Sequence, residues 1–327
     1  MNKIKLVTHS GRFHADDVFA TAVLMMLLEK QGKEFELIRS RKSEDIESGD
    51  IVYDNGREYD EERKKFDHHQ EGGAGERENG VPYAAFGLIW KHYGKVLIEE
   101  FLKEKFAVES IEKENNQNAC PNSSEDINKI FQLIDESLVQ PIDASDTGYE
   151  DFKSSKKNLR TYVMDSAVKS FNPTDEEGYE KAQKLFLEFV EIAKKILARE
   201  LISTEHKIKG FKMVESAYEN AEDKRIIILN EGGSWREILV SHTEPLYVIF
   251  PTVDSDGFMI QAVNKEISGY EVRKSFPKNW RGKGMENNEL EKETGIAGTK
   301  FCHLKGFLCV TKTKEQAIAI AEKAICG

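Results

Sequence analysis

Proline and cysteine are scarce in this chain of 327 residues, which has only seven prolines and four cysteines. Few prolines and 39% apolar residues argue against a disordered chain and favour about two globular domains of ordinary size. The cysteines form neither a CxxC pair nor metal-finger spacing, so we interpret them as free thiols in a reducing compartment. They are Cys120, Cys302, Cys309 and Cys326.

A long hydrophobic run is also missing. The longest largely apolar run covers residues 19–28, well short of the ~20 residues that cross a bilayer. The first residues turn polar before a signal-peptide core could form, so we expect a cytoplasmic protein with no membrane association.

Positive charge is in deficit, because 47 lysines and arginines face 58 acidic residues and give a net charge of −11. An acidic protein repels nucleic acid, which argues against broad, non-specific binding of duplexes. Short or single-stranded anionic substrates remain candidates where basic residues gather locally.

Short β-rich runs alternate with helical patterns in the first part of the chain, which is typical of a parallel α/β sheet. The expected strands cover residues 4–9, 35–41, 50–56 and 64–70, and the expected helices cover 16–30, 83–106 and 124–139. A long amphipathic segment at 177–202 follows and is expected to connect two halves of the chain.

Beyond this segment the pattern changes to strands at 225–229, 246–253 and 257–263, with a final helix at 314–325. We therefore predict two domains, residues 1–205 and residues 206–327. The second is expected to be a smaller α/β domain.

Carboxylates and imidazoles gather where the first strands end, which is where ligands bind in open α/β sheets. The loop after the first strand contains His9 and His14 and leads into Asp16 and Asp17. Helix capping explains one of the two aspartates, but it does not explain the two imidazoles. Asp54 lies where the third strand ends, and taken alone it is explained equally well as a turn residue before Asn-Gly or as a functional residue.

Two more clusters follow along the chain. Asp67, His68 and His69 are hard to explain as core or as a solvated face, because consecutive residues of a strand point to opposite sides. This pattern is typical of a metal site. Asp143 and Asp146 end a predicted helix, and turn chemistry could explain either of them.

Together the four clusters supply carboxylate and imidazole groups and no thiolate, a ligand set that suits Mn²⁺ or Mg²⁺ before Zn²⁺. So many carboxylates would repel one another without cations, and more than one metal ion is needed to neutralise them. Two ions ~3.5–4 Å apart can activate a water molecule and bind both the attacking and the leaving oxygens of a phosphoryl group.

The predicted second domain carries basic and aromatic residues that suit a phosphate and a base. The candidate substrate-binding residues are Lys265, Arg273, Arg281 and His303. Trp280 lies near them in the sequence and is an aromatic residue that could stack a base. An ordinary charged surface explains any single lysine equally well, because acidic residues are interspersed nearby.

The segments THSGRFHADDVFATAVL, DIVYDNGREYDEERKKFDHHQ, PIDASDTG and GTKFCHLKGF resemble motifs of the Myg family of DHH phosphoesterases and occur in that family's order. The resemblance covers nearly the whole chain. It implies a DHH-type parallel-sheet catalytic domain followed by a smaller α/β substrate-binding domain. It also implies a dinuclear centre that prefers Mn²⁺, with Mg²⁺ as the alternative, and exonuclease action on RNA.

Carried over position by position, the resemblance implies a set of metal ligands in which Asp54 bridges two ions. The implied ligands are His9, Asp16, Asp54, Asp67, His68 and either Asp143 or Asp146. In the superfamily's first motif three residues separate histidine from aspartate, whereas here four residues separate His9 from His14. Whether His14 binds a metal, orients water or contacts phosphate is therefore open, and we count His14, His68 and His69 as candidate catalytic residues.

The leading hypothesis is a Mn²⁺-dependent phosphodiesterase, an exonuclease on short or single-stranded RNA that uses two-metal activation of water while the second domain closes over the substrate. A small-molecule phosphohydrolase acting on a nucleotide, a cyclic dinucleotide or a phosphoanhydride is the enzymatic alternative, and the acidic net charge favours it slightly. A metal-stabilised regulatory protein without turnover is the alternative from another class. A homodimer is left open.

Overall fold

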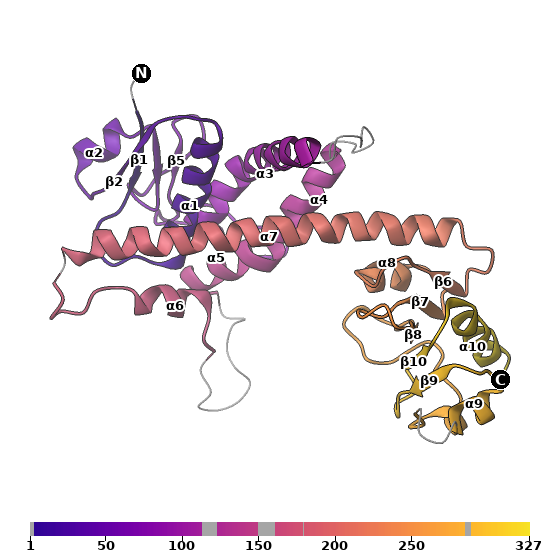
Figure 1. Ribbon diagram of the computed structural model, residues 1–327. Coiled ribbons are helices and arrows are strands. Elements are labelled where there is room, and N and C mark those ends of the chain that lie inside the picture. The colour runs from indigo at the N-terminus through magenta and orange to yellow at the C-terminus, as the bar shows by residue number, and fades with distance from the viewer. Residues whose placement is uncertain (1–2, 113–122, 150–160, 179, 285–288) are drawn as a thin grey trace. The chain divides into compact units, whose positions relative to one another are not determined.

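The structure, a computed structural model, describes residues 3–112, 123–149, 161–178, 180–284 and 289–327, with residues 107–112 described by their backbone alone (Figure 1). The chain divides into two compact units, Met1–Glu205 and His206–Gly327. Each unit combines a β-sheet with helices, so the predicted α/β fold class is confirmed. Cys302, Cys309 and Cys326 are free thiols, whereas Cys120 lies outside the described residues.

The first unit is built on a sheet of five strands in the order β2-β1-β3-β5-β4. The strands are β1 (Ile4–Thr8), β2 (Phe35–Arg39), β3 (Ile51–Tyr53), β4 (Tyr59–Asp60) and β5 (Lys65–Phe66). β1 pairs in parallel with β2 and β3, and β3 pairs in parallel with β5, which confirms the predicted parallel sheet. β4 alone runs antiparallel, at the edge next to β5.

Helix α1 (Ala15–Lys30) follows β1, and most of its residues are buried on every side rather than along one face. It packs against α3 (Ala85–Glu112), where Phe86 lies 5.3 Å from Phe19 between ring centroids. A helix in the middle of a core is apolar all round, which is why its sequence shows so little amphipathic contrast.

The remaining helices of the first unit are α2 (Ser43–Ser48), α4 (Ser124–Ile134), a π-helical turn (Asp135–Val139), α5 (Gln140–Asp146) and α6 (Met164–Ser170). The predicted helix over residues 124–139 is thus α4 together with the π-helical turn. The structure corrects the helix expected at 177–202, since α7 runs over Lys181–Glu219 and crosses the boundary between the units. Ile208 and Val214 continue the buried stripe of this helix past residue 202.

The second unit has a mixed sheet in the order β6-β7-β8-β10-β9. Its elements are β6 (Ile226–Ile228), α8 (Trp235–Ser241), β7 (Tyr247–Pro251), β8 (Phe258–Ala262), a 3₁₀ turn (Lys278–Trp280), α9 (Glu289–Thr294), β9 (Thr299–Cys302), β10 (Leu308–Thr311) and α10 (Lys314–Cys326). Only β6 and β7 pair in parallel. The strands and final helix expected from the sequence are present, whereas β9 and β10 were not expected.

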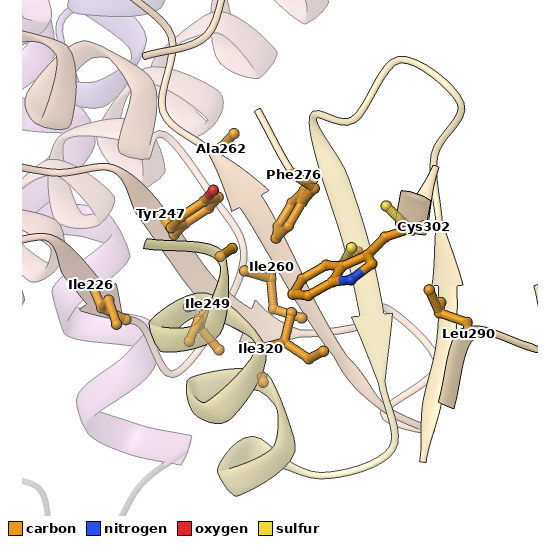
Figure 2. Close-up of a cluster of buried hydrophobic side chains, with 14 residues drawn as sticks. Ile226, Tyr247, Ile249, Ile260, Ala262, Phe276, Leu290, Cys302 and Ile320 are labelled. Atoms are coloured by element: carbon orange, nitrogen blue, oxygen red, sulfur yellow. The ribbon is translucent and has the colours of Figure 1, made fainter. Parts of the chain in front are cut away.

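A cluster of buried side chains holds the sheet of the second unit against α10 (Figure 2). Tyr247 and Phe276 lie 4.8 Å apart between ring centroids, and Trp280 is only 3% exposed within this cluster. The sequence-based expectation that Trp280 could stack a base is therefore wrong, because its ring belongs to the core. None of the described helices combines the length and the apolar content that a bilayer crossing requires.

Gly87 in α3 lies at a close contact with α5. Its backbone N–H donates to Asp143 Oδ1 at 2.9 Å, and an added Cβ would overlap the side chains of Asp143 and Arg77. Gly210 in α7 has no atom within 4 Å of an added Cβ and serves as the matched control.

We expect Gly87→Ala to lower the free energy of unfolding by about 1–3 kcal/mol, because a buried polar pair must move. Gly210→Ala should raise it by about 0.5–1 kcal/mol, because alanine is the better helix former. Urea denaturation followed by circular dichroism measures both values. Equal stability of Gly87→Ala and the unaltered protein would contradict the close approach of α5.

Candidate metal centre

Three neighbouring parallel strands end at one place on the first sheet, and polar side chains follow each of them. His9 comes directly after β1, Asp54 directly after β3, and Asp67 directly after β5. Because the strands are parallel, their carboxyl ends lie at one edge and bring these side chains together. His68 and His69 lie beyond the end of β5, so the strand geometry assumed for them in the sequence does not apply.

The loop after β3 has an unusual backbone. Asp54, Gly56 and Arg57 all have positive φ angles, of 47°, 93° and 55°. Non-glycine residues adopt such angles at a cost in free energy, and they concentrate at functional sites. The loop is stabilised by Asp67, whose Oδ2 accepts from the backbone N–H of Arg57 at 2.6 Å.

Helix α1 begins with a cap that involves the site. The backbone N–H of His14 donates to Asp17 Oδ1 at 2.9 Å, so Asp17 is the capping aspartate. Its other oxygen lies 3.3 Å from His9 Nε2. Asp16 does not cap the helix: it is fully buried, and neither of its carboxylate oxygens has a hydrogen-bond partner among the described residues.

Asp54 lies at the middle of the cluster. Its Oδ2 is 3.0 Å from His9 Nε2, and its Oδ1 is 3.5 Å from His68 Nε2 and 3.4 Å from His69 Nδ1. His68 Nε2 is also 3.2 Å from Asp146 Oδ2.

Three groups of side chains in the described part of the chain can each present ligand atoms within 4.8 Å of one another. They are Asp54, Asp67, His68 and His69; His9, His14 and Asp54; and His14, Asp16 and Asp146. Asp54 belongs to two of the groups and His14 to two. Buried atoms without a hydrogen-bond partner in this part of the chain include both oxygens of Asp16, Asp54 Oδ1 and His68 Nε2. Buried polar atoms are normally paired, so the donor set fits divalent cations.

Burial and mutual repulsion disfavour ionisation of the aspartates at the start of α1. Burial raises the pKa of Asp16 well above its usual range, and the charges of Asp54 and Asp146 add to the effect. Burial also raises the pKa of Asp17 to about 7, although His9 opposes the rise. Without a cation, these carboxyl groups therefore hold protons at a pH where ordinary aspartates are ionised.

For the histidines, the neighbouring carboxylates favour the charged, protonated form. Burial lowers the pKa of His68, but the carboxylates of Asp146 and Asp54, which lie 3.2 and 3.5 Å from its Nε2, outweigh burial and raise the value to about 10. For Asp54, burial raises the pKa, yet the nearby imidazoles of His68 and His9 prevail and hold it well below its usual range. Protonated imidazoles thus neutralise the carboxylates in the absence of metal.

Asp143 and Asp146 have different surroundings, although both belong to α5. Asp143 is fully buried, and its Oδ2 lies 2.9 Å from Arg77 Nη2. Arg77 also binds Asp135 with two hydrogen bonds, of 2.8 and 2.9 Å. Burial raises the pKa of Asp143 to about 7, with Arg77 opposing the rise. The structure brings Asp146, and not Asp143, beside His68 and Asp16.

The candidate substrate-binding residues of the second unit have partners within that unit. The Arg273 guanidinium donates to the carbonyl oxygens of Val240 and Pro245, and Arg281 Nε donates to the carbonyl oxygen of Phe276. Lys265 pairs with Glu271. His303 instead lines a cavity of about 600 Å³ with Arg236, Tyr270 and Lys305.

Sequence reasoning missed several residues around the centre. Arg41 and Arg57 line a cavity beside His9 and Asp54, and Arg77 holds Asp143. The glycine-containing turn after Asp54 marked the position of Arg57, but no sequence pattern marked the other two, since each acts across contacts between distant segments.

The comparison with protein families defines the class of protein. A family model described as an uncharacterised protein family, UPF0160 (MYG1_exonuc), matches residues 5–325. The chain belongs to this family, and the family predicted from the motifs is confirmed.

Relatives of the chain are similar over nearly their whole length. The MYG1 protein of Caenorhabditis elegans is 28% identical, over 97% of this chain and 94% of the relative. The human MYG1 exonuclease is 26% identical, over 98% of this chain and 85% of the relative. Among solved structures, a pGpG-specific phosphodiesterase from Vibrio cholerae gives a TM-score of 0.25 at 13% identity, covering 99% of both chains. RecJ from Thermus thermophilus gives 0.23 at 13% identity, covering 99% of this chain and 50% of RecJ.

Metal binding should release protons and so strengthen as the pH rises. Asp16 and His68, the latter with a pKa of about 10, hold protons that an incoming ion must displace. The positive charge of the ion also favours loss of the proton from the nearby Asp17, whose pKa is about 7. For each proton released, the apparent dissociation constant for Mn²⁺ should fall by about tenfold per pH unit. Calorimetric titrations between pH 6 and 8 measure it, and a constant that does not change with pH would contradict the assignment.

Proposed function

We propose that this protein is a metal-dependent phosphoesterase that hydrolyses phosphodiester bonds, acting as an exonuclease on short or single-stranded RNA. The observation that carries the proposal is the convergence of buried carboxylates and imidazoles at the carboxyl ends of β1, β3 and β5. Several of their ligand atoms have no hydrogen-bond partner among the described residues. The relatives named MYG1 exonuclease support a nuclease activity.

The metal ligands that we propose are His9, Asp16, Asp54, Asp67, His68 and Asp146. Asp54 is placed to contribute to two ions, because it belongs to two of the ligand groups. Carboxylate and imidazole ligands suit Mn²⁺ or Mg²⁺. When bound, such ions supply charge neutralisation for a phosphoryl group and lower the pKa of water.

His69 is proposed to exchange a proton with the substrate or its leaving group. Its Nδ1 donates to Asp67 Oδ1 at 2.8 Å, which leaves Nε2 as the nitrogen that is free to accept a proton. Its side chain is 55% exposed, compared with 9% for His68, and it lines a cavity beside the cluster. Asp67 thus orients His69 in the way that a carboxylate orients a catalytic imidazole.

The cavity that contains His69 has a volume of about 700 Å³, within the range of ligand sites. His14 and Lys169 line it together with the residues Gly72, Gly73 and Gly75. These three glycines have positive φ angles and open space where a Cβ would lie, so a substrate can approach their backbone closely. Lys169 supplies a positive charge for a phosphate, although it pairs with Asp165 in the structure.

In the second unit, the proposed contact with substrate rests on His303. The backbone N–H of Lys305 donates to His303 Nδ1 at 3.1 Å, so Nε2 of the neutral ring carries the hydrogen and is a donor. Lys305 and Arg236 bring positive charge to the same cavity, and the fully exposed Tyr270 offers a face for stacking. Substrate roles for Lys265, Arg273 and Arg281 remain predictions.

The test is hydrolysis by protein that has been stripped with a chelator and reloaded with Mn²⁺ or Mg²⁺. We expect stepwise shortening of single-stranded oligoribonucleotides, with Mn²⁺ more active than Mg²⁺ and no activity without metal. Asp54→Asn should lower kcat/KM by at least about a hundredfold, because the residue contacts both proposed ions. Asp175→Asn, an exposed position remote from the cluster in sequence, should leave it unchanged.

Parallel assays distinguish the other candidate functions. Turnover of pyrophosphate, a mononucleotide or a cyclic dinucleotide without shortening of RNA would favour the small-molecule phosphohydrolase. Thermal stabilisation by Mn²⁺ without hydrolysis of any substrate would favour the regulatory alternative. A cytoplasmic location and a homodimer remain predictions that these assays do not address.

A further inference from the structure

A second cavity adjoins the candidate metal centre. It has a volume of about 330 Å³ and shares His9, Asp54, Asp67 and His69 with the centre. The rest of its wall is formed mainly by Arg41, Ile46, Asn55 and Arg57. The proposed function assigns no role to this cavity.

Two guanidinium groups line the cavity, and neither forms an ion pair among the described residues. Arg41 donates from Nε to the Ser10 carbonyl oxygen at 3.1 Å, and its Nη2 lies 3.1 Å from His9 Nδ1. For the Arg57 side chain the described residues provide no hydrogen-bond partner. By contrast, Arg63, a few residues after Arg57 in the sequence, forms an ion pair with Glu58 at 2.5 Å.

Both arginines are exposed and lie beside a centre with five aspartates, yet neither pairs with any of these aspartates, in a protein whose net charge is −11. A guanidinium presents a planar fork of donors that matches the oxygens of a phosphate. Two such forks on one small cavity therefore indicate an anion as the occupant.

The backbone segments that carry the two arginines are fixed in place. The Asn55 side chain donates to the Ser40 carbonyl oxygen at 2.7 Å, which joins the segment of Arg57 to the segment of Arg41. The backbone of Arg57 is fixed in its left-handed conformation by the hydrogen bond to Asp67. A cavity whose walls are preorganised binds its ligand with a smaller entropic cost.

We propose that Arg41 and Arg57 bind a second phosphate of the substrate, one nucleotide away from the phosphate that is cleaved. The proposal rests on the proposed function and deepens it. The cavity directly adjoins the carboxylates of the metal centre, and successive phosphates of a nucleic acid strand are separated by a single nucleoside. The substrates are then oligonucleotides with at least two phosphates, and a dinucleotide with a terminal phosphate is the shortest good substrate.

The experiment compares three ribodinucleotides: one with only the internucleotide phosphate, one with an added 5′-phosphate and one with an added 3′-phosphate. We expect one of the terminal phosphates to raise kcat/KM by about tenfold or more, mainly through KM, because charge-assisted hydrogen bonds are strong. The arm that responds shows which end of the substrate lies in the cavity.

The variants Arg41→Ala and Arg57→Ala should bring the ratio between the phosphorylated and the plain dinucleotide close to one. Taking a ratio removes any general loss from Arg41→Ala, which contacts His9. Arg63→Ala is the matched control, since this arginine pairs with Glu58 outside the cavity, and it should retain the full ratio.

A measurement of dinucleotide binding, the binding arm of the experiment, tests the site without relying on turnover. With Ca²⁺ in place of the catalytic ions, calorimetry should show tighter binding of the phosphorylated dinucleotide in the unaltered protein and lose that difference in Arg57→Ala. Metal-dependent hydrolysis with equal kcat/KM for all three dinucleotides would overturn the second-phosphate site and leave the proposed function intact. If no dinucleotide is hydrolysed, the oligoribonucleotide assay decides the proposed function, and the binding arm alone decides the site: equal binding of all three dinucleotides overturns it.

Discussion

The crowding of buried carboxylates at the end of one parallel sheet is the constraint on which the rest of the first unit depends. Asp16, Asp17, Asp54 and Asp67 are all at most 3% exposed. Ionised groups buried this closely are stable only with opposite charge beside them. The chain supplies His9 and His68, and raised pKa values keep further protons on the cluster. Divalent cations can replace these protons, which couples metal binding to pH.

Elsewhere in the same unit a buried carboxylate is neutralised in a different way. Asp143 has an arginine and a backbone N–H as permanent partners, and Arg77 is shared with Asp135 in the π-helical turn. Such a pair needs nothing from solution, and it locks α5 against α3 and the loop that carries Arg77. Asp143, whose Oδ2 is ion-paired with Arg77, is therefore a structural aspartate, although it lies only three residues before Asp146 of the centre. Neither oxygen of Asp16 has an arginine or lysine partner among the described residues.

The sequence predicted the parts of the structure that depend on local pattern. The parallel sheet, α1 and the family follow from strand periodicity, helix start signals and motifs, and the structure and the family comparison confirm them. The loops that meet at the sheet edge were also named correctly as neighbours, because parallel strands share an edge. Metal ligation by their side chains remains a prediction.

Features that depend on distant contacts were not predictable. Nothing local distinguishes Asp143 from Asp146, since the difference is made by Arg77, more than sixty residues earlier in the sequence. Trp280 looked like a stacking surface, yet it packs against Phe276 in the core of the second unit. Likewise, α7 continues well beyond residue 202 because its later apolar residues find partners in the second unit, which the first part of the helix does not reveal.

Diffraction from crystals grown with Mn²⁺, with data collected at wavelengths on either side of the manganese absorption edge, tests the central claim most directly. The account predicts anomalous peaks within coordination distance of Asp54, with Asp16, Asp67, His9, His68 and Asp146 as the other nearest groups. Absence of manganese at this cluster, in a protein that binds the ion elsewhere or not at all, would contradict the account.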